Sequence, residues 1–492
     1  MGMAISHRGN GRGPDKITAD VIVVGSGPGG AVTAAMCAEA GKFVVMLEEG
    51  QYLPLESAPH FSREEILQKY RNAGVNIGFG AAKLAYVEGC CVGGGSEINR
   101  GLYHRTPEAV LDHWRRDYRV DALSLPELTP HFAASEEVAK VEYLPGPAPH
   151  LSSRLEEGAH RLAWAVLEVP RLYTYATDTM TGAPGRKQSM SETFVPRFLN
   201  AGGELVPNTC ARRIARSNGR WTVHARRTTP TGPQEIELTA KTVFVAGGAV
   251  QTPWLLRRSG IKRNVGDSLR FHPMLKAVAM FEDEINTPGE LEPVHQIKEF
   301  DPRFSIGCSM SKRPALALAL AAHPQMLEAV DRDWRRMAIY YVQSTGGIGR
   351  VRSLPGFRDP LVRVDLSPLD LKELADGLAR LAEVLFAAGA KAVYPSIPGY
   401  SVLRSPGDIA RLPHTLSPTQ ANATTMHLFS SCPMGEDPYK CATNSFGRVH
   451  GMDNLFIADA SLLCSPTVVN PQGTVMAVAH RNVTRAIEDR AI

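Results

Sequence analysis

Residues 25–30 read GSGPGG, a glycine-rich turn of the kind that holds the pyrophosphate of a dinucleotide. In such a turn Gly25 permits a sharp bend, Gly27 lets the backbone approach the phosphates, and Gly30 allows a helix to pack closely on a strand. Glu48 ends the next apolar run, where its carboxylate can accept hydrogen bonds from an adenosine ribose. These residues indicate a bound dinucleotide, and they leave open whether it is FAD or NAD.

The segments on both sides of this turn have the sequence patterns of strands and a helix. The β-branched run 20–24 predicts a buried strand, residues 31–40 predict a helix, and residues 43–47 predict a second strand. Because strand, glycines, helix and strand follow one another, dinucleotide binding is a better interpretation than a purely structural turn. Two more strand-like runs, 242–246 and 455–458, can share the same sheet.

A second glycine-rich segment covers residues 89–99 and reads GCCVGGGSEIN. It is too long and too flexible for a packing element, and we expect it to lie against a flat group. In order and spacing, this segment and three later ones resemble the signature regions of the glucose-methanol-choline oxidoreductases. The later segments are residues 248–261, 427–461 and 470–474.

The resemblance implies FAD as the cofactor. Some members of that family tether the flavin through a histidine in the first glycine-rich loop, where this chain has Ile98, so we expect non-covalent FAD. Asp459 and Pro471 also have plain structural interpretations, as a helix cap and as part of a turn, which are compatible with cofactor contact. The residues expected to bind FAD are Gly25, Gly27, Gly30, Glu48, Gly94, Gly95, Ser96, Asn99, Asp459, Ala460, Asn470, Pro471 and Thr474.

The same resemblance makes His427 the general base and Asn470 its partner. Oxidising an alcohol removes the hydroxyl proton and moves a hydride from the same carbon to flavin N5, and a histidine can take that proton near neutral pH. We therefore expect oxidation of a primary or secondary alcohol to an aldehyde or ketone. A flavin-containing lyase of the hydroxynitrile-lyase type, without net redox change, stays open as the alternative. Without the resemblance, four other histidines compete with His427 for the role: His104, His272, His450 and His480.

The expected fold is α/β, a Rossmann-like FAD-binding domain with an inserted antiparallel-sheet (α+β) substrate domain. A chain of 492 residues exceeds what one ordinary core needs. The resembling segments assign residues 18–107, 185–265 and 418–492 to the FAD-binding domain. The substrate-binding domain is then expected to comprise residues 108–184 and 266–417.

Composition restricts the partners. The net charge of +4 is spread over a chain with 21% charged residues, which gives no basic run typical of nucleic-acid binding. No stretch has the length and apolarity of a membrane span, and the polar leader of about 17 residues lacks the apolar core of a signal peptide, so a cytoplasmic location is expected. The eight cysteines show no zinc-like spacing, and no metal is expected. The expected partners are a small alcohol and an electron acceptor, which is O2 or another compound.

Overall fold

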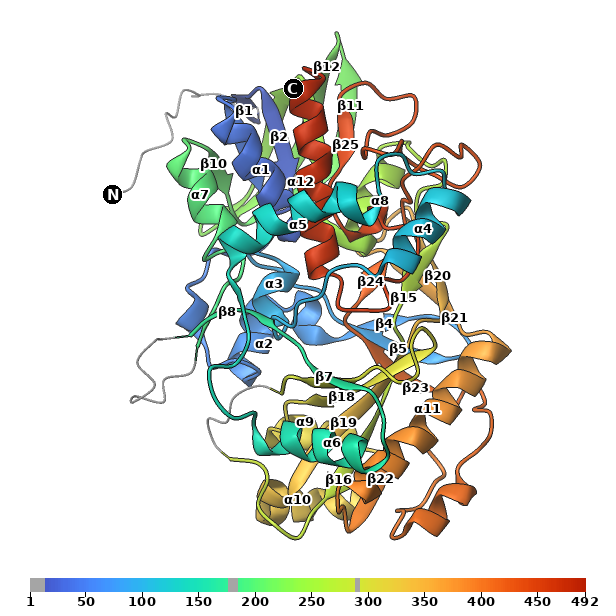
Figure 1. Cartoon of the computed structure of the whole chain (residues 1–492). Helices are drawn as coiled ribbons and strands as arrows, with labels where there is room; N and C mark the ends of the chain where they lie inside the picture. The colour runs from blue at the N-terminus through green and yellow to red at the C-terminus, as the bar shows by residue number, and fades with distance from the viewer. Residues whose placement is uncertain (1–13, 176–184, 288–292) are drawn as a thin grey trace.

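The computed structural model describes residues 14–175, 185–287 and 293–492. Figure 1 shows two halves, one above the other, each built around a large β-sheet. We call them the parallel-sheet half, drawn at the top, and the nine-strand half, drawn below it. Most of the predicted polar leader lies outside the described residues. Its last residues differ from the prediction, because Asp15–Thr18 form strand β1.

The parallel-sheet half is organised by a five-stranded sheet in which all neighbouring strands are parallel. Its strand order is β10-β3-β2-β14-β25, so the three strand-like runs predicted to share a sheet are direct neighbours. The strands are almost entirely buried, as expected for a sheet covered on both faces. Their bounds are β2 (Val21–Val24), β3 (Val44–Leu47), β10 (Glu204–Val206), β14 (Thr242–Val245) and β25 (Leu455–Ile457).

Helices cover this sheet. Helix α1 (Pro28–Glu39) packs against α12 (Gln472–Glu488) and α7 (Phe194–Asn200), and α5 (Leu125–Ala139) packs on α12. Helix α8 (Gly248–Arg258) follows β14 directly and contacts the strands of a second sheet. Helix α4 (Glu108–Asp117) lies at the side of the same half (Figure 1).

The second sheet of this half is a four-stranded sheet in the order β1-β13-β12-β11. Three of its strands form an antiparallel meander. Strand β1 pairs in parallel with β13, and this pairing explains why residues 15–18 form a strand. The meander comprises β11 (Thr209–Ser217), β12 (Arg220–Thr229) and β13 (Gly232–Ala240).

The nine-strand half contains a mostly antiparallel sheet in the order β4-β5-β23-β16-β19-β18-β17-β7, with β22 also paired to β16. Strands β16 and β19 form its centre, with Tyr341 opposite Lys276 and Gln343 opposite Met274. The strands are β4 (Asn76–Gly78), β5 (Lys83–Tyr86), β7 (Val166–Glu168), β16 (Met274–Met280), β17 (His295–Ile297), β18 (Phe304–Ser309), β19 (Met337–Ser344), β22 (Ala392–Pro395) and β23 (Asn422–Thr425).

The two faces of this sheet have different neighbours. Helices α6 (His150–Arg161) and α11 (Pro368–Ala387) pack on one face. Gly377 brings α11 so near that an added Cβ would lie 2.4 Å from a methyl carbon of Val342. Since successive residues of a strand point to opposite faces, Tyr341 and Gln343 face away from α11 and toward the parallel-sheet half. Two short helices, α9 (Arg313–Ala319) and α10 (Leu327–Asp333), cover the far end of the sheet (Figure 1).

Two smaller sheets join the halves. One is β21-β20-β15-β24 and the other is β6-β8-β9. Their strands are β15 (Leu269–Phe271), β20 (Ile348–Arg352), β21 (Leu361–Asp365), β24 (Leu428–Phe429), β6 (Val141–Glu142), β8 (Arg171–Thr174) and β9 (Arg186–Lys187). The predicted domain boundaries stay a proposal. Strands β4, β5 and β23, placed by that prediction in the FAD-binding domain, pair within the nine-stranded sheet, whereas α5 packs on the other half.

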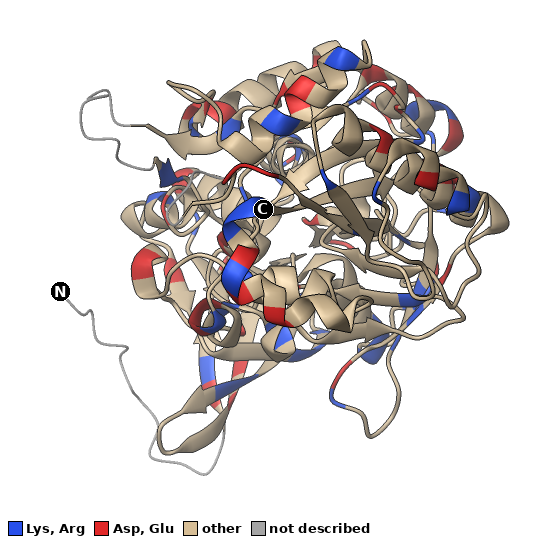
Figure 2. Ribbon diagram, turned by 90° about the horizontal axis from the view of Figure 1, so that it is seen from below, with Lys and Arg blue, Asp and Glu red and all other residues tan. Residues whose placement is uncertain are grey.

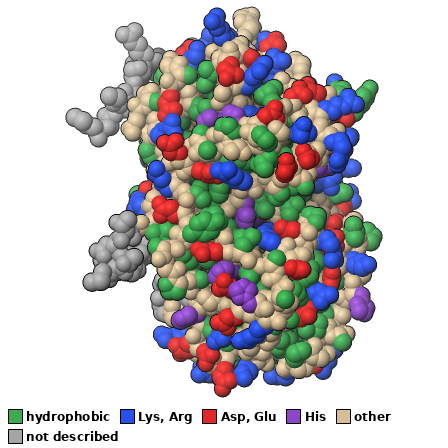
Figure 3. Space-filling view, in the orientation of Figure 1, with side chains coloured by type: hydrophobic (Ala, Val, Ile, Leu, Met, Phe, Trp, Pro, Cys, Tyr) green, Lys and Arg blue, Asp and Glu red, His purple; other side chains and the backbone are tan. Residues whose placement is uncertain are grey.

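Basic and acidic residues are mixed along the helices and loops in Figure 2, and they are interspersed on the face shown in Figure 3. Within the described residues, no helix combines the length and the apolarity needed to cross a bilayer.

Candidate functional site

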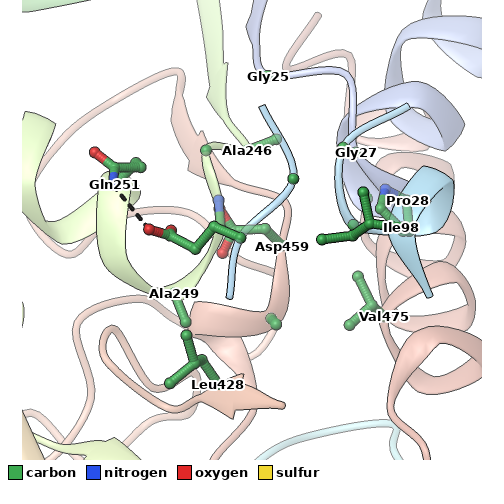
Figure 4. A pocket seen from close by; sticks show the side chains of 18 of the residues that line it. Gly25, Gly27, Pro28, Ile98, Ala246, Ala249, Gln251, Leu428, Asp459 and Val475 are labelled. Carbon is green, nitrogen blue, oxygen red and sulfur yellow. Dashed lines mark hydrogen bonds between the residues drawn. The ribbon is translucent and has the colours of Figure 1, made fainter. Parts of the chain in front are cut away.

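A large pocket lies where the two halves meet, with an empty volume of about 1830 Å³. This volume includes space that is open to solvent, and the lining residues come from both halves, so one ligand can contact both. Figure 4 shows Ile98 and Val475 on one side of the pocket and Gln251 and Ala249 on the other. Strands β2, β3 and β14 end at this pocket, which is the usual ligand edge of a parallel sheet.

The glycines of the first turn occupy three different surroundings. Gly25 has a φ of 107°, and a Cβ on it would lie 2.3 Å from the carbonyl oxygen of Ala246. A Cβ on Gly30 would lie 2.0 Å from the carbonyl oxygen of Gly25, so helix and strand leave no room there. A Cβ on Gly27 would meet nothing within 4 Å, because this residue faces the pocket. Only Gly27 is therefore free to contact a ligand closely.

Glu48 lies at the pocket edge of β3, held by three hydrogen bonds. Its carboxylate accepts from the hydroxyl of Ser26 at 2.6 Å, from the amide of Ser26 at 3.2 Å and from the amide of Gly50 at 2.8 Å. Burial raises the pKa of Glu48, and these hydrogen bonds act in the opposite direction. The carboxylate is thus fixed in place beside the pocket, where a ribose hydroxyl can donate to it.

The second glycine-rich loop touches the first. Gly94 has a φ of 55°, and a Cβ on it would lie 2.9 Å from the Cα of Gly27. A Cβ on Gly95 would meet nothing within 4 Å, so Gly95 faces the pocket as Gly27 does. Two glycine backbones therefore open onto one cavity, which fits the flat and extended shape of a flavin dinucleotide.

Two polar side chains of this loop, Ser96 and Asn99, form hydrogen bonds with other residues of the protein. Ser96 donates to the carbonyl of Gly93 at 2.7 Å and accepts from the amide of Met190 at 2.9 Å. Asn99 donates to Gln472 at 2.5 Å. Both side chains hold the loop in shape, and the predicted contact of Ser96 with the cofactor stays a prediction.

Asp459 joins the end of β25 to the start of α8. Its carboxylate accepts from the amide of Gly248 at 2.9 Å, from the hydroxyl of Thr252 at 2.5 Å and from the amide of Ser461 at 2.8 Å. The last of these bonds caps the 3-10 helix Ala460–Leu462, as the structural interpretation predicts. The side chain also borders the pocket, so the two interpretations remain compatible.

The structure gathers most of the predicted site residues around this one pocket. Three of them, Gly30, Ser96 and Thr474, do not line the pocket, and the hydroxyl of Thr474 is hydrogen-bonded to that of Thr106 at 2.8 Å. The predicted residues that line the pocket are Gly25, Gly27, Glu48, Gly94, Gly95, Asn99, His427, Asp459, Ala460, Asn470 and Pro471. The sequence interpretation gave no role to several other lining side chains. Gln251 and Trp254 belong to the resembling segment 248–261, whereas no motif marks Arg71, Glu88, Arg100, Tyr341 and Gln343. The dashed line in Figure 4 marks the hydrogen bond of 3.2 Å from Gln251 to Glu88.

His427 and Asn470 lie together at the wall of the pocket. The Nε2 of His427 is 3.5 Å from the Nδ2 of Asn470, and its Nδ1 is 3.1 Å from the Nδ1 of His272. Burial, together with the positive charges of Arg100 and Lys298, lowers the pKa of His427 to about 4. His427 is therefore neutral near pH 7, in the form that can accept a proton.

The competing histidines have other surroundings. Both ring nitrogens of His104 are buried without a hydrogen-bond partner among the described residues. His450 bonds the carbonyl oxygen of Gly435 at 3.1 Å, and His480 pairs with His131 at 2.9 Å. His272 alone among these four contacts His427, and sequence reasoning gave it no role.

Comparison with known proteins agrees with this architecture. The N-terminal GMC oxidoreductase model matches residues 19–274, and the C-terminal one matches residues 349–479. The GMC-type oxidoreductase y4nJ of Sinorhizobium fredii is 36% identical over 96% of this chain and 95% of its own length. The long-chain-alcohol oxidase FAO4A of Arabidopsis thaliana is 25% identical over 94% of this chain and 68% of its own.

A solved structure of Aspergillus oryzae formate oxidase, a protein described for its FAD modification, shares the fold. Its TM-score is 0.73 at 14% identity, over 98% of this chain and 100% of that chain. Together with the family models, it supports the predicted α/β fold, with a Rossmann-like half and a sheet-rich half. The family of the matching models implies FAD as the cofactor. The chain belongs to the GMC oxidoreductase family and is an oxidoreductase.

Proposed function

We propose that this protein oxidises a primary or secondary alcohol to an aldehyde or ketone, with non-covalently bound FAD as the hydride acceptor. The observation that carries the proposal is the His427–Asn470 pair, which borders the same pocket as the two glycine-rich loops. The name of the long-chain-alcohol oxidase that resembles this chain supports an alcohol substrate. Ile98 lines the pocket and offers no nucleophile, which supports non-covalent binding.

The hydrogen bonds around His427 select its tautomer. The side-chain amide of Gln343 lies 3.2 Å from the Nδ1 of His272 and donates to it, so this nitrogen is an acceptor. The Nδ1 of His427, 3.1 Å away, must then carry the proton that it shares with His272. The Nε2 of His427 then carries no proton, and its lone pair faces the Nδ2 of Asn470 at 3.5 Å. This nitrogen is the one next to Asn470, where a base is needed.

Asn470 is oriented by a neighbour in the nine-strand half. Its Oδ1 accepts a hydrogen bond of 3.2 Å from Gln296, which turns its NH2 group toward His427. In this orientation Asn470 can donate to the oxygen of a substrate hydroxyl while the Nε2 of His427 takes the hydroxyl proton. Because Asn470 does not titrate, only His427 can hold the proton within this pair.

FAD, when bound beside this pair, would supply the hydride acceptor for the carbon that bears the hydroxyl group, and O2 or another acceptor would reoxidise it. Gly27, Gly94, Gly95 and Glu48 would hold the dinucleotide by the contacts described above. Helix α12 begins next to the pocket, and its N-terminal end favours negative charge there. The cytoplasmic location stays a prediction.

The test is the visible spectrum of the purified protein during anaerobic addition of a panel of primary and secondary alcohols. We expect a flavin spectrum that bleaches with some of them. Recovery on admission of air identifies an oxidase, and persistent reduction identifies a dehydrogenase. A protein that holds FAD but is bleached by no alcohol would contradict the proposal, and conversion of a cyanohydrin without bleaching would favour the lyase alternative.

A further inference from the structure

One row of residues crosses the sheet face that looks toward the pocket. Lys276 on β16 lies opposite Tyr341 on β19, and Tyr341 lies opposite Gly307 on β18. Gly307 has no side chain, and the hydroxyl of Tyr341 lies across it, 2.4 Å from where a Cβ would be. Gln296, which orients Asn470, continues the row opposite Gly307. The row therefore runs from Lys276 to the proposed catalytic pair.

The position of Lys276 is unusual for a lysine. It follows the pocket-lining Met274 by two residues, so both side chains point to the same face of the sheet. It keeps part of its surface accessible, and yet burial lowers the pKa of its ammonium group to about 8, with the charge of Arg100 acting in the same direction. Lys276 therefore lies on the pocket face of the sheet, one position beyond the lining residue Met274 on that face, although it does not itself line the pocket.

Arg100 approaches the same tyrosine from the second glycine-rich loop. It lines the pocket, its guanidinium carbon lies 5.8 Å from the centre of the Tyr341 ring, and it donates to the carbonyl oxygen of Cys308 at 2.8 Å. A guanidinium has five N–H donors, and that bond uses only one of them. Its charge also lowers the pKa of His427, so it lies near the reacting atoms.

Neither cation has a counter-ion within the described part of the chain. No carboxylate lies within 4.0 Å of Arg100 or Lys276, whereas the nearby Lys298 pairs with Asp301 at 3.7 Å. Two positive charges in an enclosed space are costly unless a negative group joins them. Arg71, for example, pairs with Glu49 at 2.8 Å, whereas other buried cations, such as Arg481 and Lys187, donate to several backbone carbonyl oxygens.

We propose that the substrate alcohol carries an anionic oxygen group, a carboxylate or a phosphate, which Arg100 and Lys276 bind beside Tyr341. This inference rests on the proposed function, because it names the substrate class of the same site. The hydroxyl would lie at His427 and Asn470, and the anionic group would lie farther along the row, toward Lys276. The cations then act as specificity residues and take no part in the proton transfer.

The test compares acids with their neutral counterparts in the FAD-loaded enzyme. The probes are lactate, mandelate and omega-hydroxyhexanoate, each beside its methyl ester, and glycerol phosphate beside glycerol. We expect at least one acid to reduce the flavin with a kcat/KM about ten- to a hundredfold above its neutral counterpart, since hydrogen bonds to charged groups contribute about 1.5 to 3 kcal/mol. The carboxylate and phosphate arms tell which anion is bound.

Two variants assign this preference to the cations. Lys276→Met should raise KM for the acid about tenfold or more, while the kcat/KM for the neutral counterpart stays unchanged and shows that the protein is folded. In Arg100→Met, whose lost charge also acts on His427, the acid should lose about tenfold more kcat/KM than its neutral counterpart. The control is Arg350→Met, an equal change of charge at an exposed position of β20 outside the pocket, which should alter neither.

Two results would overturn the inference and leave the proposed function intact. One is equal oxidation of the acids and their neutral counterparts by the native enzyme. The other is an equal loss of acid and neutral turnover in the Arg100 variant, which would assign the charge to the bound flavin instead. Failure of every alcohol to bleach the flavin would contradict the proposed function itself, and this inference with it.

Discussion

The pocket has two walls of different construction. The wall from the parallel-sheet half is made largely of backbone, at Gly27, Gly94 and Gly95, where side chains are absent. The wall from the nine-strand half is made of long polar side chains, such as Tyr341 and Gln343, carried on paired strands. A backbone wall accepts one shape of ligand and tolerates few substitutions. A side-chain wall can change its chemistry by single substitutions while the sheet stays the same.

The proposed catalytic pair lies between the two walls, and its loss should have the largest effect. His427→Ala removes the group that we propose takes the hydroxyl proton, so we expect flavin reduction by alcohol to slow by about 10² to 10⁴-fold. Stopped-flow absorbance under anaerobic conditions measures this rate. The FAD content and the melting temperature should stay near those of the native protein. A variant that reduces its flavin at the native rate would exclude His427 as the base.

Two alanine substitutions sharpen the description of the backbone wall. Gly30→Ala places a methyl group against the carbonyl of Gly25, and we expect it to lower the free energy of unfolding by about 1 to 3 kcal/mol. Gly27→Ala meets only open space, so the apoprotein should keep its stability and lose affinity for FAD. Thermal unfolding and FAD titration of both apoproteins separate these effects. Equal destabilisation by both would show that Gly27 is also a packing residue.

A smaller effect is expected where a residue acts through His427. His272→Phe removes the acceptor of the Nδ1 proton of His427, and we expect kcat to fall about tenfold because the base loses its fixed tautomer. In the same variant, the pH at which the rate falls in acid should also differ from that of the native enzyme. His272→Asn supplies a carbonyl oxygen in place of the ring nitrogen and should recover part of the rate. If Asn and Phe behave alike and the pH profile is unchanged, His272 is only structural.

The mildest test changes only the pH. Since burial lowers the pKa of His427 to about 4, the neutral base persists in weak acid, and the rate of flavin reduction should stay level from pH 8 to about pH 5. It should fall only below that range, as the ring takes up a proton and loses its lone pair. A midpoint near the ordinary histidine value of about 6.5 would mean that the base is solvated in the working enzyme.

The two walls also differ in how far the sequence could predict them. The glycine turn, Glu48 and the strands β2, β14 and β25 are contiguous patterns, and the structure places all of them around one pocket edge. Arg100 follows the predicted Asn99 directly and was still missed, because its significance depends on Tyr341 and Lys276, which are distant in sequence. Likewise, β1 pairs with β13 far along the chain, and nothing in a polar leader signals that partner.

The order of strands in the parallel sheet also affects how the chain is made. Strand β14 forms hydrogen bonds with β2 on one side and with β25 on the other, although these strands begin at residues 21, 242 and 455. During synthesis the parallel sheet that contains β2 therefore cannot be completed until most of the chain has left the ribosome. Until then the apolar edge of β14 is open to other chains. We expect yields from recombinant expression to depend strongly on temperature and on chaperones, and a chain that stops before residue 455 to aggregate.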